Sequence, residues 1–406
     1  MPSILFINRV YPPDSGATGR VLEHAARSFV KAGWDVTVLA TAASRESAGE
    51  TVQDGVRIFR VGILFSKKTL VARALGYALM IPGLLLKALR LPRHDVVVTK
   101  TDPPMLVVIG PIIKATKGSR PIHWAQDLYP EVAEECGVLP KGGFLAGILR
   151  RLSTWGIQRH DLTLAVGRCM AERLVGRGIS SEAIRVVPNA GLEGEIVPTP
   201  CALPRERNAL RETHGIGDAF VIMYSGNMGR AHDFTTVIGA ARRLQEQGEK
   251  NILFLFVGEG PEESLIRREV FARKLENIRF LSPQPAATLS ESLGTGDLHL
   301  VTMKEGMEGL VVPSKFYGVM AAARPTLFVG SKDSEVARMI LEHGIGQVIA
   351  PGDDAILAEV ILRYRADPDL VKSEGNKARV ALKALDLSPM ILMEVMQILP
   401  VMKALD

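Results

Sequence analysis

One loop in the second half of the chain combines glycines with a permanent cation. Residues 223–233 read MYSGNMGRAHD, which is an apolar run, a Gly-x-x-Gly-Arg turn and the start of a helical pattern. Gly226 and Asn227 open this turn, and glycine there allows a ligand to approach the backbone closely. The guanidinium of Arg230 is suited to the oxygens of a diphosphate. We predict that this loop binds an anion; the alternative is a surface arginine beside an ordinary turn.

A second polar loop precedes a short helical pattern and carries another cation. Residues 304–325 read KEGMEGLVVPSKFYGVMAAARP. Proline is favoured in the first turn of a helix and serine is a favoured cap, so we expect Ser314 and Lys315 at a helix start. The preceding main-chain amides include those of Gly309, Leu310 and Val311. Together with Lys315 they predict a second anion site, and Glu308 is placed to accept hydrogen bonds from sugar hydroxyls.

Two further glycine-containing turns follow expected strands. Gly16 lies in YPPDSGATGR, where main-chain amides can approach an anion or a sugar, and Gly258 with Glu259 closes the apolar run 253–257. The first turn does not have GxGxxG spacing, so the dinucleotide-binding fingerprint is absent. Glycines are also common in such a turn for its geometry alone, so the first turn taken singly is a weak motif.

Asp127 is the candidate carboxylate of the first half of the chain. It follows the apolar run 122–126 in IHWAQDLYPE, which places it at the carboxyl end of an expected strand. A carboxylate in that position can act as a general base or bind hydroxyl groups. The alternative is structural, with Asp127 capping a helix that begins near Leu128, and the local residues taken alone favour this cap.

The composition excludes several other classes of protein. The chain has 406 residues, of which 47% are hydrophobic and 23% charged, as expected for two to three globular domains. Its three cysteines form no CxxC or Cys/His cluster, which disfavours structural zinc and fits a reducing compartment. The N-terminal residues do not read as a signal peptide. A net charge of +5 suits anionic partners, but with 5% aromatic residues we expect no nucleic-acid binding.

Short apolar runs alternate with helical patterns along the chain. This alternation predicts parallel sheets covered by helices on both faces. Residues 191–207 contain prolines and charges with little periodicity, so we expect a linker there. We predict two doubly wound, Rossmann-like α/β domains, residues 1–190 and 208–385, with a helix at about 388–406 completing the first. Because ligands of open parallel sheets lie beyond the carboxyl ends of strands, we expect a cleft where the domains face each other.

Two basic, apolar segments predict contact with a membrane surface. Residues 69–86 read TLVARALGYALMIPGLLL, with Arg73 as the one charge and lysines and arginines on both sides. Arg73 and Pro82 disfavour a membrane span, whereas basic flanks favour a helix lying on an anionic membrane. Residues 144–159 carry a weaker signal of the same kind. The alternative for both segments is an ordinary helix packed on the first sheet.

Six segments in order along the chain resemble one family of enzymes. The chain resembles the GT-B fold, retaining glycosyltransferases of family four, in the bacterial subgroup that builds O-antigen, capsule and exopolysaccharide repeat units. The segments span nearly the whole chain in the family's order and are specific for family and fold, although not for the sugar or the acceptor. They are YPPDSGATGRVLEHAARSFVKAGWDVTVLA, DLYPE, AERLVGRGISSEAIRVVPNA, YSGNMGRAHDF, FVGEGPE and EGLVVPSKFYGVMAAARPT.

The resemblance implies a nucleotide-sugar donor in the second domain and an acceptor in the first. We expect a UDP- or GDP-sugar, with UDP favoured, and transfer of a hexosyl or N-acetylhexosaminyl group. The expected acceptor is a saccharide, either linked to a lipid such as polyprenyl diphosphate or of another kind. The enzyme would work in the cytoplasm, peripherally on the inner face of the cell membrane. Glu308 lies near the first of the family's two signature glutamates, although the spacing differs. Gly318 stands where the second, which usually holds the nucleotide ribose, is expected, so the resemblance does not extend to ribose recognition.

The expected reaction breaks the bond between a sugar and a diphosphate, which leaves new negative charge on the leaving group. We expect Arg230, Lys315 and the amides of 309–312 to stabilise that charge. No DxD motif ends an expected strand, because Asp353-Asp354 is expected in a loop, so we predict no catalytic metal and no cofactor besides the donor. The resemblance aligns Asp127 with an acceptor-side polar position, where it would orient the acceptor or stabilise the sugar cation during same-face displacement.

Two other functions stay open on the sequence alone. One is a soluble transferase that modifies a small molecule, for which the basic, apolar residues 67–93 would be superfluous. The other is a sugar-nucleotide epimerase or binding protein of the same fold. Release of free nucleoside diphosphate without any acceptor would favour hydrolysis or epimerase-like chemistry.

Overall fold

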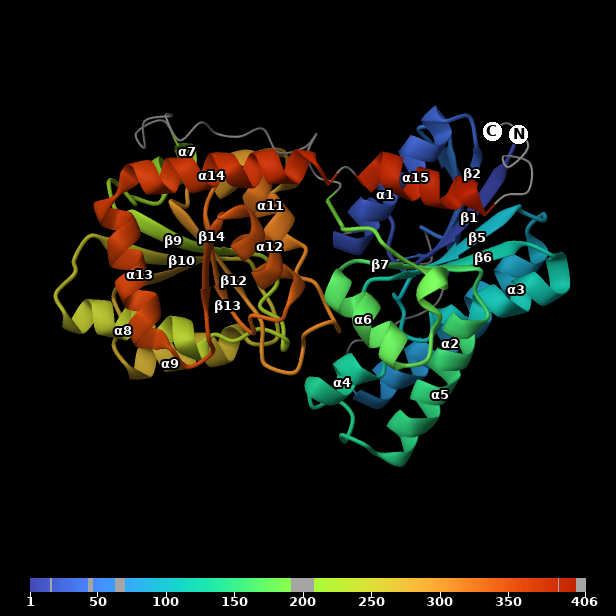
Figure 1. Cartoon of the computed structure of the whole chain (residues 1–406), viewed down its shortest axis with the longest axis horizontal. Coiled ribbons are helices and arrows are strands. Elements are labelled where there is room, and N and C mark those ends of the chain that lie inside the picture. Colours follow the sequence, from blue (N-terminus) through green and yellow to red (C-terminus); the bar gives the residue numbers. More distant parts are fainter. Residues whose placement is uncertain (15–16, 43–46, 63–69, 191–207, 386, 399–406) are drawn as a thin grey trace. The chain divides into compact units, whose positions relative to one another are not determined.

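The computed structural model describes residues 1–14, 17–42, 47–62, 70–190, 208–385 and 387–398. The chain divides into two compact units (Figure 1). Unit 1 comprises Met1–Gly191, Gly309–Val312 and Asp386–Asp406, and unit 2 comprises Leu192–Glu308 and Pro313–Leu385. The predicted linker, residues 191–207, lies outside the described residues, as does the end of the predicted C-terminal helix.

Unit 1 is built on an eight-stranded sheet in the order β3-β4-β2-β1-β5-β6-β7-β8. All neighbouring strands are parallel except the pair at the β3 edge. The central strand β1 is buried on both faces because it consists almost wholly of large apolar residues. The strands are β1 (Ser3–Ile7), β2 (Asp35–Thr41), β3 (Gly49–Gln53), β4 (Val56–Val61), β5 (Val96–Thr99), β6 (Arg120–Ala125), β7 (Leu162–Ala165) and β8 (Ile184–Val186).

Helices cover both faces of this sheet. Figure 1 shows α1 and α15 on one face and α2, α3 and α5 on the other. Helix α15 packs against α1, and its Glu394 forms an ion pair of 3.2 Å with Arg185. The helices are α1 (Ala17–Lys31), α2 (Leu70–Arg90), α3 (Ile109–Lys117), α4 (Glu131–Glu135), α5 (Phe144–Gln158), α6 (Arg168–Gly176) and α15 (Leu387–Gln397).

Helix α2 contains most of the segment predicted to lie on a membrane. Its inner face belongs to the core, because Met80 and Leu84 are buried and Leu84 packs with residues of β1 and β5. Leu79 and Leu86 on the outer face are exposed. The inner face of the segment is therefore that of a helix packed on the sheet, and contact of its outer face with a membrane stays a prediction. In the described part of the chain, no helix combines the length and apolar character needed to cross a membrane.

Unit 2 is built on a six-stranded, fully parallel sheet in the order β11-β10-β9-β12-β13-β14. The prediction of two doubly wound α/β domains is thus confirmed, with one antiparallel edge strand in unit 1 as an addition. The strands are β9 (Phe220–Ser225), β10 (Ile252–Val257), β11 (Ile278–Leu281), β12 (Leu298–Thr302), β13 (Thr326–Val329) and β14 (Gly346–Ile349). The helices are α7 (Ala209–Thr213), α8 (Thr235–Glu246), α9 (Glu263–Ala272), α10 (Leu289–Gly294), α11 (Lys315–Ala321), α12 (Glu335–His343), α13 (Asp354–Ala366) and α14 (Pro368–Lys383).

Candidate functional site

The candidate site of unit 2 lies where the strand order of its sheet reverses. From β9 the chain passes to β10 on one side, and β12 later pairs with β9 on the other side. Loops that leave two such strands diverge, and ligands of open α/β sheets bind there. The loop after β9 carries Gly226 and Arg230, and Lys315 begins α11 after β12. A Cβ atom at Gly226 would lie 3.4 Å from Lys315 Cε, so these two predicted site residues are neighbours.

The ammonium of Lys315 is held among neutral groups. Its Nζ donates a hydrogen bond to the Tyr224 hydroxyl, lies 3.7 Å from the centroid of that ring, and lies 3.5 Å from Nε2 of His232. No carboxylate among the described residues forms an ion pair with it. Burial holds the pKa of Lys315 well below its usual range. A desolvated cation without a protein counter-ion favours an anionic ligand.

The loops after β9 and β10 pack backbone against backbone. Gly226 N–H donates to the Val257 carbonyl (2.9 Å), and Met228 N–H donates to the Glu259 carbonyl (2.9 Å). A Cβ atom at Gly258 would come within 2.2 Å of the Gly226 oxygen, so only glycine permits this approach. Gly258 and Glu259 thus fix the shape of the candidate site, and a direct contact with ligand stays a prediction.

The polar side chains of these two loops point outward. Asn227, Arg230 and Glu259 are exposed. Arg230 forms no ion pair with another residue in the described ranges, so its guanidinium is available to a ligand. The Asn227 carbonyl accepts the Tyr224 hydroxyl proton (2.7 Å). The predicted association of Arg230 with the glycine loop is therefore present, with its charge at the surface.

The second predicted anion site is divided between the two units. Gly309–Val312 belongs to unit 1, where the Leu310 carbonyl accepts a hydrogen bond of 2.9 Å from Leu128 N–H. Glu308, Ser314 and Lys315 belong to unit 2. Ser314 does precede α11, but its side chain makes no capping hydrogen bond, contrary to expectation. A contact of the amides of Gly309, Leu310 and Val311 with a ligand stays a prediction.

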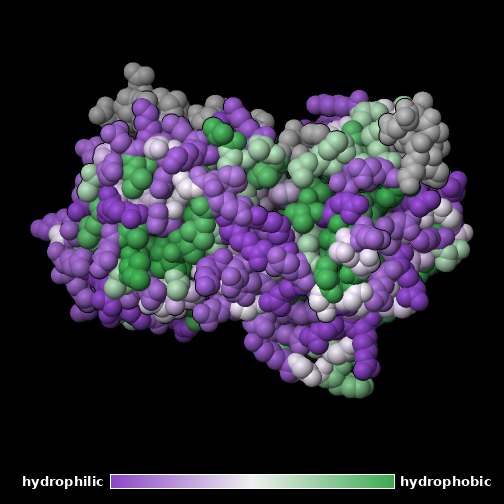
Figure 2. Space-filling model, in the orientation of Figure 1, coloured by the Kyte–Doolittle hydropathy of each residue, from purple (hydrophilic) through white to green (hydrophobic). Residues whose placement is uncertain are grey.

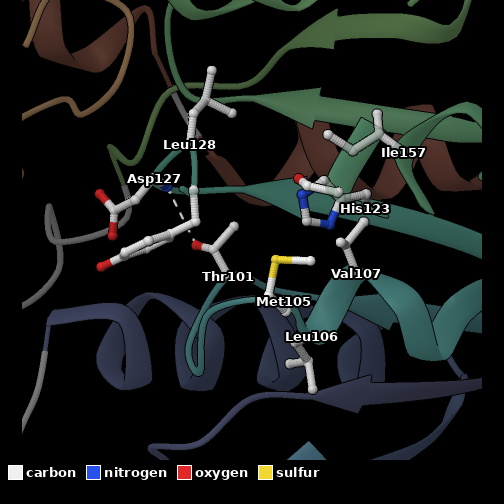
Figure 3. Close-up of a pocket in the computed structure, with 10 residues that line it drawn as sticks. Thr101, Met105, Leu106, Val107, His123, Asp127, Leu128 and Ile157 are labelled. Carbon is white, nitrogen blue, oxygen red and sulfur yellow. Dashed lines mark hydrogen bonds between the residues drawn. The ribbon is translucent and has the colours of Figure 1, made fainter. Parts of the chain in front are cut away.

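Asp127 lies in unit 1 at the rim of a small pocket. Figure 3 shows Asp127 on one side of Thr101 and the apolar side chains of Met105, Leu106 and Val107 on the other. Thr101 Oγ1 accepts hydrogen bonds from the main-chain N–H groups of Gln126 and Asp127, each 3.3 Å long. The carboxylate caps no helix, because α4 begins only at Glu131 and has Pro130 at its N-cap. The structural alternative for Asp127 is therefore wrong.

Burial and two charged neighbours tune the Asp127 carboxyl. Burial, with repulsion from Asp102, raises its pKa to about 7 against the attraction of Lys100. Burial likewise lowers the pKa of the wholly buried Lys100 to about 7, although Asp102 and Asp127 oppose the shift. Asp102 also pairs with Arg9 at 2.7 Å. A carboxyl that titrates near neutral pH is suited to acid–base work or to hydrogen bonding of hydroxyls.

Sequence reasoning missed Lys100, Tyr224 and His232. Lys100 directly follows β5, where the strand order of the unit 1 sheet reverses between β1 and β5. Its Nζ donates to the Thr18 carbonyl (2.9 Å) and lies 4.1 Å from the Trp124 ring. Lys100 could have been found from the sequence as a cation that directly follows an apolar strand. Gly16, predicted to contact a ligand, lies outside the described residues.

The described residues contain no cluster of three or more His, Cys, Asp or Glu side chains placed as metal ligands. Asp354, expected in a loop, is the first residue of α13, and it forms an ion pair of 3.1 Å with Arg243. Metal independence itself stays a prediction.

Comparisons with known proteins agree with this architecture. Residues 16–190 match the family described as "Glycosyl transferase 4-like domain", and residues 206–381 match "Glycosyl transferases group 1". The "Probable glycosyltransferase WbjE" of Pseudomonas aeruginosa is 29% identical over 272 residues, which are 67% of this chain and 66% of that protein. The "Putative colanic acid biosynthesis glycosyl transferase WcaI" of Escherichia coli K12 is 26% identical over 56% of this chain and 55% of its own. The alignments thus span less than two thirds of these relatives' own lengths.

A solved structure shares the fold at low identity. Anabaena HepE in complex with UDP-glucose has a TM-score of 0.69 and 16% identity, covering 98% of this chain and 100% of its own. The two family matches follow one another along most of the chain, in step with its two parallel-sheet units. The chain belongs to the glycosyltransferases of the GT-B fold.

Proposed function

We propose that this protein transfers a sugar, with retention of configuration, from a UDP-sugar to a saccharide acceptor in bacterial cell-surface polysaccharide assembly. The observation that carries the proposal is the Lys315 ammonium, desolvated beside a glycine loop and without a carboxylate partner among the described residues. The relatives support it, since one is described as a putative colanic acid biosynthesis glycosyl transferase and a structural neighbour binds UDP-glucose.

Unit 2 is proposed to hold the donor. Departure of the nucleoside diphosphate places new negative charge on the leaving oxygen, and fixed cations lower the free energy of that transition state. Lys315 supplies a half-buried cation and Arg230 an exposed one. These two cations are proposed to replace a catalytic metal, so that the donor is the one small molecule the reaction requires besides the acceptor.

Unit 1 is proposed to bind the acceptor. Asp127 has a pKa near 7 and borders a pocket with both polar and apolar walls. A carboxyl in this setting can bind a sugar hydroxyl or take up its proton. We assign it a role toward the acceptor and no covalent step.

The acceptor is proposed to be lipid-linked, and the protein to bind the cytoplasmic face of the membrane through α5. Phe144 and Leu145 at the start of this helix are 87% and 55% exposed, and Ile148 and Leu152 continue the same apolar face. Figure 2 shows pale to green surface at the tip of unit 1 where α5 begins. This helix presents four exposed apolar side chains, whereas the described exposed leucines of α2 are Leu79 and Leu86.

Charges around α5 suit an anionic surface. Arg150 faces α4, where it binds Glu131 and Glu134, so that charge is neutralised within the protein. Arg151 and Arg159 are exposed, and neither forms an ion pair with a described residue. Exposed apolar side chains beside unpaired arginines are typical of helices that lie on anionic lipid.

The test is a transfer assay with a panel of UDP- and GDP-sugars and two acceptors, a polyprenyl-diphosphate-linked sugar and the same sugar without lipid. We expect turnover with a UDP-sugar and the lipid-linked acceptor. The anomeric configuration of the product linkage, axial or equatorial, should be the same as that of the donor. Turnover that is equal on both acceptors would refute the lipid-linked assignment. Release of UDP with an epimerised sugar and no transfer would refute the transferase.

A further inference from the structure

We propose that Tyr224 and His232 position the Lys315 ammonium by each accepting one of its hydrogen bonds, which leaves one N–H group for the phosphate of a bound ligand. This inference rests on the proposed donor site of unit 2. It assigns a role to two side chains that touch Lys315 rather than the ligand. All the groups involved lie within unit 2.

The hydrogen-bonding role of His232 is fixed by its backbone partner. Nδ1 lies 2.5 Å from the Thr302 carbonyl oxygen, which can only accept, so Nδ1 carries the ring proton. In a neutral ring Nε2 then has a lone pair, and it faces Lys315 Nζ at 3.5 Å. Burial and the nearby charges of Lys315 and Lys304 lower the pKa of His232 to about 3. The ring therefore stays neutral, and its Nε2 stays an acceptor, throughout the physiological range.

Tyr224 is arranged in the same way. Its hydroxyl donates to the Asn227 carbonyl (2.7 Å), which leaves the oxygen lone pairs to accept from Lys315. The ring is held by edge contacts with Phe234 and His232, whose centroids lie 5.1 Å and 5.9 Å away. The orientation of the hydroxyl is thus set by the core before any ligand arrives.

Both acceptors are tied to the two strands that flank the reversal of strand order. Thr302 is the last residue of β12, and Asn227 lies in the loop directly after β9. Lys315 is therefore joined at the same time to the ends of both strands, through side chains whose own protons are used on main-chain oxygens. An ammonium fixed by two neutral acceptors loses less freedom when it meets an anion than a free lysine would.

The arrangement also explains why the partners of the Lys315 ammonium are neutral side chains and not carboxylates. An aspartate or glutamate beside Nζ would neutralise the charge that the ligand must use. Tyrosine and neutral histidine orient the ammonium without cancelling it, because they contribute lone pairs and no net charge. The cost is a desolvated cation, which is consistent with the lowered pKa of Lys315.

The test compares Tyr224→Phe, His232→Leu and His232→Gln. Phenylalanine keeps the ring and the packing but loses the acceptor, leucine removes the acceptor, and glutamine can restore an acceptor oxygen near the Nε2 position. We expect Tyr224→Phe and His232→Leu each to weaken UDP binding about tenfold in calorimetry, the usual effect of losing one hydrogen bond to a charged group. His232→Gln should recover most of this loss. In the transfer assay kcat should fall more than KM rises, because the leaving-group charge is greatest in the transition state.

A matched control is Tyr364→Phe. This buried tyrosine of unit 2 donates its hydroxyl to Glu374, whereas the partners of the Lys315 ammonium are Tyr224 and His232. We expect loss of the Tyr364 hydroxyl to change stability and to leave the hydrogen bonds of Lys315 in place. UDP affinity should be unchanged once measured below the melting temperature. Equal effects of Tyr364→Phe and Tyr224→Phe on UDP binding would overturn the inference, because they would reveal a general loss of stability.

The outcomes separate this inference from the proposed function. If the wild type binds UDP but Tyr224→Phe and His232→Leu bind it equally well, the positioning role is refuted and the donor site stands. If the wild type binds inorganic pyrophosphate and not UDP, and the variants weaken that binding, the positioning role stands and the donor assignment fails. If the wild type binds neither, both are refuted.

Discussion

The two sheets reverse their strand order in the same way, yet the lysine near each reversal has opposite surroundings. In unit 2 the Lys315 ammonium meets a hydroxyl, a ring nitrogen and an aromatic face. In unit 1 the Lys100 ammonium lies within the field of Asp102 and Asp127. The charge in unit 1 is thus balanced by carboxylates, whereas no carboxylate among the described residues pairs with the charge in unit 2. We expect a diphosphate to bind at the unit 2 site and neutral hydroxyl groups to bind at the unit 1 site.

The largest effect should follow removal of the unit 2 cations. Lys315→Ala and Arg230→Ala should each lower kcat by a factor on the order of 100 to 1,000, because each removes a charge that stabilises the leaving diphosphate. The double variant should lose more, with its melting temperature within a few degrees of the wild type. Lys372→Ala is the matched control, an exposed lysine of α14 in the same unit. Near-normal turnover by the double variant would show that these two cations do not stabilise a leaving diphosphate, and the functional difference inferred between the two units would fail.

Asp127 should give a smaller but pH-dependent effect. Its pKa of about 7 means that the carboxylate is the minor form at pH 6 and the major form at pH 8. If the carboxylate serves the acceptor, kcat/KM rises with pH through about 7, and Asp127→Asn lowers kcat roughly 100-fold and removes this rise. The measurement is a pH profile of transfer between pH 5 and 9.

Asp102 provides the control for this profile. Its negative charge raises the pKa of Asp127, so Asp102→Asn should move the rise in kcat/KM to lower pH. A profile that is identical in the wild type and in Asp127→Asn would show that another group titrates. In unit 2, His232→Gln should leave the midpoint of the pH profile unchanged, because the pKa of His232 is about 3 and lies outside the measured range.

The alternation of strands and helices was readable from the sequence because fully buried parallel strands such as β1 and β10 are continuous apolar runs. The sequence also showed that Arg230 and Lys315 each lie in or beside a turn that contains glycine. It did not show that Lys315 lies next to Gly226, because that contact depends on which strands pair. Tyr224 and His232 were missed because each has an ordinary local context and acquires its role only from backbone oxygens of distant residues.

Exposure and capping were the other points that local patterns could not decide. Both α2 and α5 are apolar, but only the packed structure distinguishes the buried Leu84 from the exposed Phe144. Asp127 and Ser314 have residue types that commonly cap helices, and neither side chain caps one. Pro130 delays the start of α4, and tertiary packing overrides a preference worth about 1 kcal/mol.

Loss of exposed apolar residues from α5 of unit 1 should weaken vesicle binding about tenfold, whereas a similar loss in unit 2 should not. Replacing Phe144 and Leu145 with serine removes exposed apolar area from α5, so the double variant should partition at least tenfold less onto vesicles containing anionic lipid. Leu341→Ser, at a 65% exposed leucine of unit 2, should have no effect and is the matched control. Vesicle sedimentation at low and high salt is the measurement. Equal binding by all three proteins, or equal binding to neutral vesicles, would contradict a docking surface on α5.

The smallest expected effect is that of a chelator. If Lys315 and Arg230 together stabilise the leaving diphosphate, no divalent ion is needed to bridge its oxygens, and excess EDTA should leave kcat within about twofold of its starting value. The control is Lys315→Ala. With one cation removed, added Mg²⁺ or Mn²⁺ should partly restore turnover in this variant, since a metal can neutralise the same charge, whereas the wild type should respond little. Loss of wild-type activity in EDTA that Mg²⁺ restores would show that the desolvated lysine does not replace a metal, and that the charge left open in unit 2 is shared with an ion.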